Sequence, residues 1–181
     1  GFIREYFNQN PLSQLGLIVA RDGVGERLTE LRGSPEAHVS ALKKTLDASG
    51  DFSLQNTLNV ARTSLKSIPA YGSREVLYIL SALSTCDPGN VWTEVAAAKA
   101  AKVRVNVVSL AAELHVSRRM ADETGGDFGV SLNADHLHDL IMAHAPPPPL
   151  SEEATKSSLV QMGFPQKKHV ASDALTVGVT G

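Results

Sequence analysis

Cysteine is almost missing from this chain, which has a single one, Cys86, among its 181 residues. One cysteine excludes a disulfide within the sequence and a cysteine-rich zinc site, and it favours a reducing compartment. Neither sign of charge dominates, because 17 Lys and Arg face 19 Asp and Glu, so we expect direct DNA binding to be absent or weak. The longest apolar runs, near residues 15–20 and 76–80, are too short to cross a bilayer, so no membrane partner is expected.

Signature motifs of enzymes are absent as well. The sequence has no GxxxxGK[ST] phosphate loop, no GxSxG elbow and no HExxH motif. Cys86 has no adjacent histidine, so we interpret it as a small buried side chain. His136, His138 and His144 lie near one predicted helix, and we interpret them as solvated or capping groups. These features favour a protein that is not an enzyme.

What the sequence does contain is an alternation of apolar strands and amphipathic helices. Residues 15–20 and 76–80 are continuous apolar runs, typical of strands buried on both faces. Residues 26–31 alternate polar and apolar side chains, as an antiparallel edge strand does. Further strands are predicted at 102–108 and Phe128–Val130, and helices at 2–7, 34–46, 53–65, 92–101 and 114–123 and after Asn133. This order indicates an α/β fold with a doubly wound, mostly parallel sheet and helices on both faces.

Two of these helices have apolar positions at helical spacing. In the helix that begins near Ser53, these positions are Leu54, Leu58, Ala61 and Leu65. In the helix after Ser34-Pro35, they are Val39, Leu42 and Leu46. We expect both sets to face the core.

Three oxygen-bearing side chains fall at the carboxyl ends of predicted strands, where ligands of parallel sheets bind. They are Ser53 at a helix start, Asp87 after the second buried strand and Glu113 after the third. Hard cations prefer such oxygen ligands, so a magnesium site is one interpretation. We favour the other, in which Ser53 and Asp87 are helix N-caps and Glu113 lies at the positive end of the next helix.

Several short phrases, in this order and spacing, resemble one protein family. They are residues 5–16 (EYFNQNPLSQLG), 28–31 (LTEL), 73–77 (SREVL), 85–88 (TCDP), 100–105 (AAKVRV), 123–126 (ETGG) and 162–165 (MGFP). Together they extend over nearly the whole chain. With them the chain resembles the von Willebrand factor A (VWA) domain of the zinc-finger VWA subunit of TFIIH, the general transcription and DNA-repair factor.

The resemblance implies a non-catalytic scaffold and regulatory subunit of the TFIIH core in the nucleus. Such a subunit is expected to bind and stimulate the XPD-type DNA helicase in nucleotide excision repair, and to support transcription initiation by RNA polymerase II. It is also expected to contact the smaller VWA subunit and other core subunits. In the family, zinc is bound by cysteine-rich modules further downstream, so no cofactor is expected in this chain.

The sequence departs from the VWA pattern in two ways. Metal-binding VWA domains carry Asp-x-Ser-x-Ser at the end of their first strand, and no such motif occurs here. Ser53 and Asp87 match the second-loop hydroxyl and the third-loop aspartate of that pattern, so we expect a degenerate site without metal. The sequence also opens in what would be the following helix, so we expect the first, central strand to be missing from it.

The predicted organisation is a VWA-like domain at 1–145, a Pro/Ser/Glu-rich linker at 146–158 and a tail at 159–181. Four consecutive prolines at 146–149 end the domain because they cannot continue a helix. The tail contains an apolar island that we expect to dock on a surface, formed by Leu159, Val160, Met162 and Phe164.

Partner contacts are expected in the two loops that lead from a strand into a helix, residues 84–92 and 111–119. A rigid sheet positions such loops, while their sequence tolerates change. Trp92 offers an aromatic anchor, and Arg118 and Arg119 offer the forked, weakly hydrated charge that interfaces favour. The candidate residues are Ser84, Thr85, Asp87, Trp92, Glu113, His115, Arg118 and Arg119.

Two alternative functions remain open at this point. The first is a VWA scaffold of another nuclear or cytosolic complex, such as a proteasomal ubiquitin receptor, because Met162-Gly163-Phe164 is similar to a ubiquitin-associated loop. The second is a small α/β enzyme or nucleotide binder. The missing phosphate loop, nucleophile and paired carboxylates argue against that second class.

Overall fold

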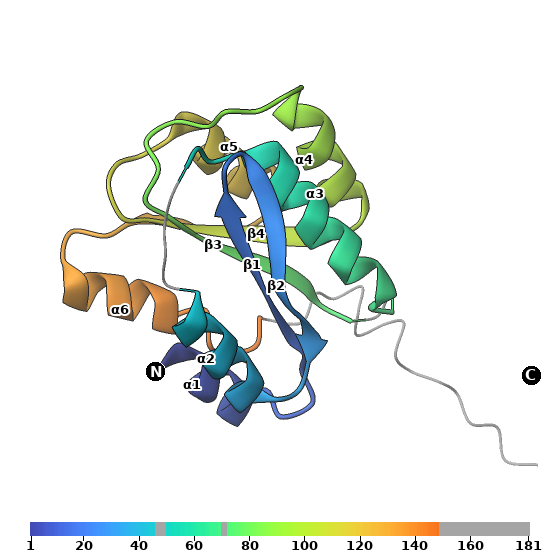
Figure 1. Cartoon of the computed structure of the whole chain (residues 1–181), viewed down its shortest axis with the longest axis vertical. Coiled ribbons are helices and arrows are strands. Elements are labelled where there is room, and N and C mark those ends of the chain that lie inside the picture. Colours follow the sequence, from blue (N-terminus) through green and yellow to red (C-terminus); the bar gives the residue numbers. More distant parts are fainter. Residues whose placement is uncertain (46–49, 70–71, 149–181) are drawn as a thin grey trace, which may run out of the picture. The chain divides into compact units, whose positions relative to one another are not determined.

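Helices and strands alternate along the chain in the predicted order. The computed structural model describes residues 1–45, 50–69 and 72–148 and is drawn in Figure 1. Its strands are β1 (Leu15–Arg21), β2 (Val24–Arg32), β3 (Arg74–Leu80), β4 (Val103–Ser109) and β5 (Phe128–Val130). Its helices are α1 (Phe2–Gln9), α2 (Pro35–Lys44), α3 (Leu54–Ser64), the short 3₁₀ helix η1 (Leu65–Ser67), α4 (Val91–Ala100), α5 (His115–Thr124) and α6 (Ala134–Met142).

Strands β3, β4 and β5 form a parallel sheet in that order. Val76 lies opposite Val105, and Val107 lies opposite Phe128. Helical crossovers between neighbouring strands require parallel pairing, so the predicted orientation is confirmed. Helices α4 and α5 pack on one side of the sheet and α6 on the other (Figure 1). Strand β4 is the centre of the core, because all but one of its residues are buried.

Strands β1 and β2 form an antiparallel hairpin through a tight turn at Asp22-Gly23, where both residues have positive φ. Rather than one continuous sheet, the described residues form two, the hairpin and the three-stranded sheet. No described strand pairs with the second edge of β1 or of β3.

The expected burial of β1 and β3 on both faces is wrong. Every residue of β1 is only half-buried. In β3, Tyr78 and Leu80 are buried, whereas Ile79 is 51% exposed. Within the described residues, each of these strands is hydrogen-bonded along one edge only. No described element covers Ile79 well enough to bury it.

Helix α3 joins the two sheets. Its predicted apolar positions are confirmed, because Leu54, Leu58, Ala61 and Leu65 are all buried. The helix packs against the hairpin, where a Cβ on Gly25 would lie 3.0 Å from the Cα of Thr57. On the other side, the hydroxyl of Tyr78 in β3 donates to the Thr57 hydroxyl at 3.2 Å.

Helix α2 differs from the prediction in the face that it buries. Its fully buried side chain is His38, whereas Leu42 is 41% exposed and Leu46 lies outside the described residues. His38 stacks on the ring of Phe7 in α1 and hydrogen-bonds Thr29 in β2. The helix therefore packs through a polar side chain whose partners lie on the hairpin. Apolar spacing in the sequence does not reveal such a residue.

The apolar island Leu159, Val160, Met162 and Phe164 lies outside the described residues, so its docking stays a prediction. The tail and the linker from residue 149 on also lie outside them, and the predicted domain boundaries stay predictions. None of the described helices is long and apolar enough to cross a membrane.

Candidate interaction surface

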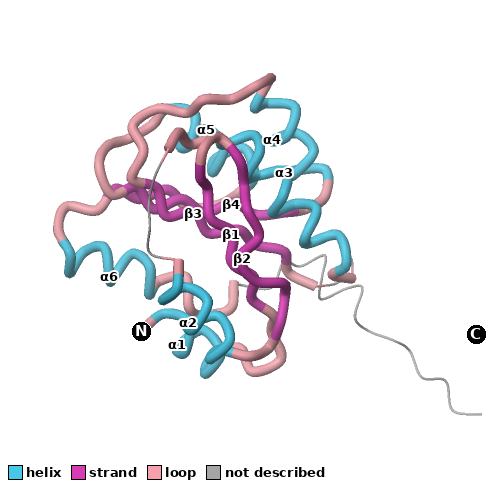
Figure 2. Tube along the Cα trace, in the orientation of Figure 1, coloured by secondary structure: helices cyan, strands magenta, loops and turns pink. Residues whose placement is uncertain are grey.

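The candidate surface lies at the carboxyl ends of β3, β4 and β5. These strands are parallel, so the loops that follow them, residues 81–90, 110–114 and 131–133, emerge at one edge of the sheet. Figure 2 shows these connections in pink. Both loops predicted for partner contact therefore belong to the same edge, and a third loop, after β5, joins them.

Asp87 lies at the centre of the first loop. Its Oδ1 accepts hydrogen bonds from the Ser53 hydroxyl and from the backbone N–H of Gln55, both at 2.8 Å. Its Oδ2 accepts from the Thr85 hydroxyl at 2.8 Å. The prediction that Asp87 caps the helix after it is wrong, because the N-cap of α4 is Asn90, whose Oδ1 accepts from the Trp92 N–H at 3.0 Å. Asp87 instead binds the first turn of α3, whose N-cap is Ser53 as predicted.

Of the three oxygen groups considered as metal ligands, the structure brings only two together. Ser53 and Asp87 bind each other, whereas Glu113 pairs with Arg118 at 3.0 Å. Within residues 1–45, 50–69 and 72–148, no group of three or more His, Cys, Asp and Glu side chains is placed to hold a metal ion. The oxygen atoms of Ser53, Thr85 and Asp87 are engaged in hydrogen bonds with one another and with α3.

Trp92 and Arg119 connect the first two loops. The guanidinium of Arg119 lies 4.1 Å from the centre of the Trp92 ring, a cation–π contact, and its Nε donates to Glu123 at 2.8 Å. Trp92 is half-buried and also packs against the core. Ser84, His115 and Arg118 are exposed. The structure places the predicted residues in two settings. The loops at this edge contain Ser84, Thr85, Asp87 and Glu113. Helix α4 contains Trp92, which also has a structural role, and α5 contains His115, Arg118 and Arg119.

Sequence reasoning missed three leucines on this surface. Leu83, Leu110 and Leu132 are 67%, 38% and 84% exposed, and each follows one of the three parallel strands. All three therefore belong to the carboxyl edge of the sheet and add exposed apolar surface to it. The available signal was their position, because each leucine comes within three residues of a strand end in a loop.

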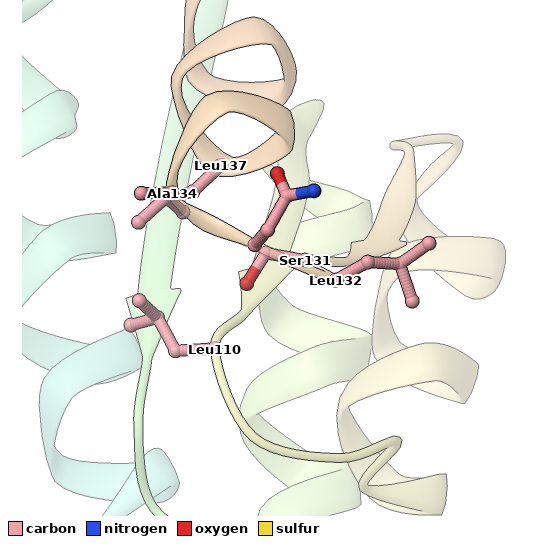
Figure 3. A pocket seen from close by; sticks show the side chains of 6 residues that line it. Leu110, Ser131, Leu132, Ala134 and Leu137 are labelled. Carbon is pink, nitrogen blue, oxygen red and sulfur yellow. The ribbon is translucent and has the colours of Figure 1, made fainter.

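A shallow hollow of about 300 Å³ lies beside two of these leucines. It is lined by Leu110, Ser131, Leu132, Asn133, Ala134 and Leu137. Figure 3 shows Leu132 extended away from Leu110 and Leu137. The hollow therefore adds a small apolar depression to the edge.

Two further predictions concern single side chains near this edge. Cys86 is exposed, so its interpretation as a buried side chain is wrong. Its backbone N–H donates to Phe52 O at 2.7 Å, which fixes the main chain and leaves the thiol outside. His136 has a capping contact, since its Nδ1 accepts from the Leu132 N–H at 3.2 Å, and His138 is exposed.

The opposite, amino-terminal edge of the sheet carries two further groups with shifted pKa values, Glu75 and His144. Arg104 and Asp127 form an ion pair at 2.7 Å. Burial raises the pKa of the Glu75 carboxyl above its ordinary value, an effect that Arg104 opposes. Burial lowers the pKa of the His144 imidazole, an effect that Asp127 opposes. These groups lie away from the loops considered for partner contact.

The parallel sheet, the flanking helices and the antiparallel hairpin define an α/β domain of the VWA type. The SpRpn10 VWA domain matches with a TM-score of 0.61 and 17% identity over 83% of this chain and 82% of that one. A von Willebrand factor type A protein from Catenulispora acidiphila matches with a TM-score of 0.65 and 12% identity over 79% of this chain and 37% of that one. The TFIIH p34 N-terminal domain matches with a TM-score of 0.53 and 15% identity over 77% and 81%. At these identities the likeness shows the fold, which confirms the predicted class.

Sequence similarity then assigns the family. Residues 1–165 match the model of the Ssl1-like family, and the chain belongs to that family. It is 47% identical to "General transcription factor IIH subunit 2" of Arabidopsis thaliana over 96% of this chain and 41% of that protein. It is 40% identical to "General transcription and DNA repair factor IIH subunit ssl1" of Schizosaccharomyces pombe over 92% and 41%. The chain thus spans less than half the length of these relatives, and the resemblance found in the sequence is confirmed.

Proposed function

We propose that this chain is the VWA module of a TFIIH core subunit and works as a scaffold rather than as an enzyme. The observation that carries the proposal is the match to the Ssl1-like family along residues 1–165. Relatives that match nearly the whole chain are named as TFIIH subunits of transcription and DNA repair. The proposed processes are therefore transcription initiation by RNA polymerase II and nucleotide excision repair, in the nucleus.

The proposed main partner is the XPD-type helicase of the same complex, which the subunit would bind and stimulate. The carboxyl edge of the sheet supports this contact because it combines exposed leucines, an aromatic ring and arginines. Interfaces favour such a combination, in which a few residues carry most of the binding energy. The smaller VWA subunit and other core subunits are the further proposed partners, and the chain itself is proposed to need no cofactor.

A binding experiment with this helicase tests the proposal. Leu83→Asp, and Arg118→Glu combined with Arg119→Glu, place charge on exposed positions of the edge. Loss of a hot-spot contact costs about 2 kcal/mol or more, so affinity should fall about thirtyfold. Helicase stimulation should fall with it. Lys66→Glu, on the exposed side of η1, is the matched charge change away from the edge and should leave both unchanged.

The melting temperatures of these variants decide how the binding result is interpreted. Leu83 and both arginines are exposed, so their replacement should leave the fold intact. Trp92→Ala is a poorer probe, because the ring also packs on the core. Unchanged affinity in folded Leu83 and arginine variants would move the interface to the outer helices or to the hairpin. A polyubiquitin pull-down separately tests the ubiquitin-receptor alternative.

A further inference from the structure

The loop after β3 is fastened to the start of α3 along its whole second half. Cys86 N–H donates to Phe52 O at 2.7 Å, Leu54 N–H to the Thr85 hydroxyl at 3.0 Å, and Gly89 N–H to the Gln55 side-chain oxygen at 2.8 Å. The Asp87 carboxylate adds its bonds from Ser53 and Gln55. Four successive residues of one segment, 52–55, thus hold the loop.

Asp87 is the residue on which these contacts converge. Both of its oxygens are occupied, one by two donors from α3 and one by Thr85 of its own loop. Hydrogen bonds to a carboxylate are roughly twice as strong as those between neutral groups. The carboxylate also faces the positive end of an eleven-residue helix. No other side chain of the loop has bonds of this strength to α3.

The segment that precedes these contacts is the one that carries the apolar side chain. Leu83 lies four residues before Asp87 and is largely exposed. Trp92 lies five residues after it, in the first turn of α4. The position of Leu83 at the surface therefore depends on how this loop is held, and the same loop leads into the helix whose first turn carries Trp92.

We propose that Asp87 is a positioning residue, which locks the β3–α4 loop onto α3 and thereby presents Leu83 and Trp92 to the partner. The proposal rests on the proposed partner-binding function of this edge. Ser53 and Asp87, the residues that match metal-ligand positions of the VWA pattern, here have a hydrogen-bonding role that links core and contact surface. The lock itself does not depend on any partner.

Amide hydrogen exchange of the full chain, without partner, tests the lock. Asp87→Ala should speed exchange at Gln55, Cys86 and Gly89 at least tenfold, because their shared anchor is lost. Asp87→Asn keeps one acceptor oxygen and should restore most of the protection. Asn56→Ala is the matched control, since Asn56 donates from the same helix turn to Gly23 O in the hairpin at 2.7 Å. It should leave the loop amides unchanged.

Affinity for the XPD-type helicase tests the positioning role with the same variants. Asp87→Ala should weaken binding at least tenfold and Asp87→Asn much less, while Asn56→Ala lowers the melting temperature without changing affinity. Thr85→Val removes both the donor to Oδ2 and the acceptor of the Leu54 N–H, so it should change exchange and affinity in the same direction as Asp87→Ala. It covers the case in which Asp87→Ala fails to fold. Unchanged exchange in Asp87→Ala overturns the lock.

The two proposals fail in different ways. Faster exchange with unchanged affinity, while Leu83→Asp still weakens binding, overturns the positioning role and leaves the proposed function in place. Absence of helicase binding by the unaltered chain overturns the proposed function and, with it, the positioning role. Exchange protection in that chain then still measures the lock.

Discussion

At the scale of single residues, His38 shows how a buried polar side chain is satisfied. The Arg32 carbonyl can only accept, so His38 Nε2 donates to it at 3.2 Å. The other ring nitrogen, Nδ1, then accepts from the Thr29 hydroxyl at 2.8 Å, and the Thr29 oxygen accepts from the Leu17 N–H at 2.9 Å. This chain of bonds connects both hairpin strands to α2, next to the register shifts of β1.

Thr29→Val should therefore destabilise the domain, although valine and threonine have nearly the same volume. The change keeps the volume but leaves the Leu17 N–H and His38 Nδ1 without their partner, which costs about 1–3 kcal/mol in the free energy of unfolding. Arg4→Ala, which breaks an exposed ion pair with Glu36, is the control and should cost less than about 1 kcal/mol. Urea denaturation measures both. Equal effects of the two changes would show that the buried network adds nothing.

A second residue-scale prediction concerns His144. Burial lowers the pKa of its imidazole from 6.5. The unfolded chain then binds a proton at a pH where the folded chain does not, so stability falls as the pH drops below 6.5. Replacing this side chain by Asn should remove that part of the acid-side loss. The pKa of Glu75 is raised above 4.5, so its protonation stabilises the folded chain as the pH falls toward that value. The effect of His144 is therefore measured as the difference in stability between the variant and the unaltered chain.

Melting temperatures between pH 7.5 and about 5.5 measure this difference. The drop on acidification should be smaller in His144→Asn than in the unaltered chain. His138→Asn, at an exposed position in α6, the helix that ends just before His144, should keep the full drop. Identical pH profiles for all three proteins would exclude the role of His144.

At the scale of elements, the sequence predicted what depends on local pattern and missed what depends on tertiary contact. The apolar spacing in α3, the parallel strands and the cap at Asn133 follow from neighbouring residues, and all are confirmed. The partner of Asp87 is 34 positions away in the chain. Asp87 binds α3 rather than capping α4 because the fold brings its loop next to the start of α3. Neighbouring residues in the sequence do not reveal this contact. The exposed thiol of Cys86 has the same origin.

The end of α5 allows an element-scale prediction with two adjacent glycines. Gly125 ends the helix with φ 72°, and a Cβ there would meet no other atom. Gly125→Ala should therefore cost only the left-handed backbone, about 1 kcal/mol. A Cβ on Gly126 would overlap the carbonyl of Val105 in β4. Because that backbone lies within the core sheet, Gly126→Ala should cost about 3 kcal/mol or more.

Thermal unfolding of the two variants compares these costs directly. Both glycines are lost from the same turn, so effects on the unfolded chain are similar and largely cancel in the comparison. We expect the unaltered chain to have the highest melting temperature, Gly125→Ala a lower one and Gly126→Ala the lowest. A reversal of the last two would mean that β4 can move away from α5.

At the scale of the whole molecule, α3 is the element that holds the two sheets together. It packs on the hairpin, receives the Tyr78 hydroxyl from β3, and anchors the β3–α4 loop through Asp87. Asn56 in its first turn also donates to the hairpin turn at Gly23 O. Just before the helix, Asp51 O accepts from the Gly23 N–H at 2.7 Å. The proposed contact surface is thus connected to the hairpin through one helix, although no described strand pairs across the gap.

The edges of β1 and β3 with which no described strand pairs lead to a prediction about association. An apolar strand with a free edge pairs readily with another chain, and proteins discourage this with charged side chains, especially Lys. Strand β3 has the sequence REVLYIL, with no charge in its last five residues, and Ile79 is half-exposed. We expect chain Gly1–Gly181 to associate as its concentration rises.

Ile79→Lys should reduce this association and leave the melting temperature unchanged, because the replaced side chain is not part of the core. Light scattering over a concentration series measures the effect, with Ile79→Val as the apolar control that should associate like the unaltered chain. Equal association of all three proteins would place the contact away from β3.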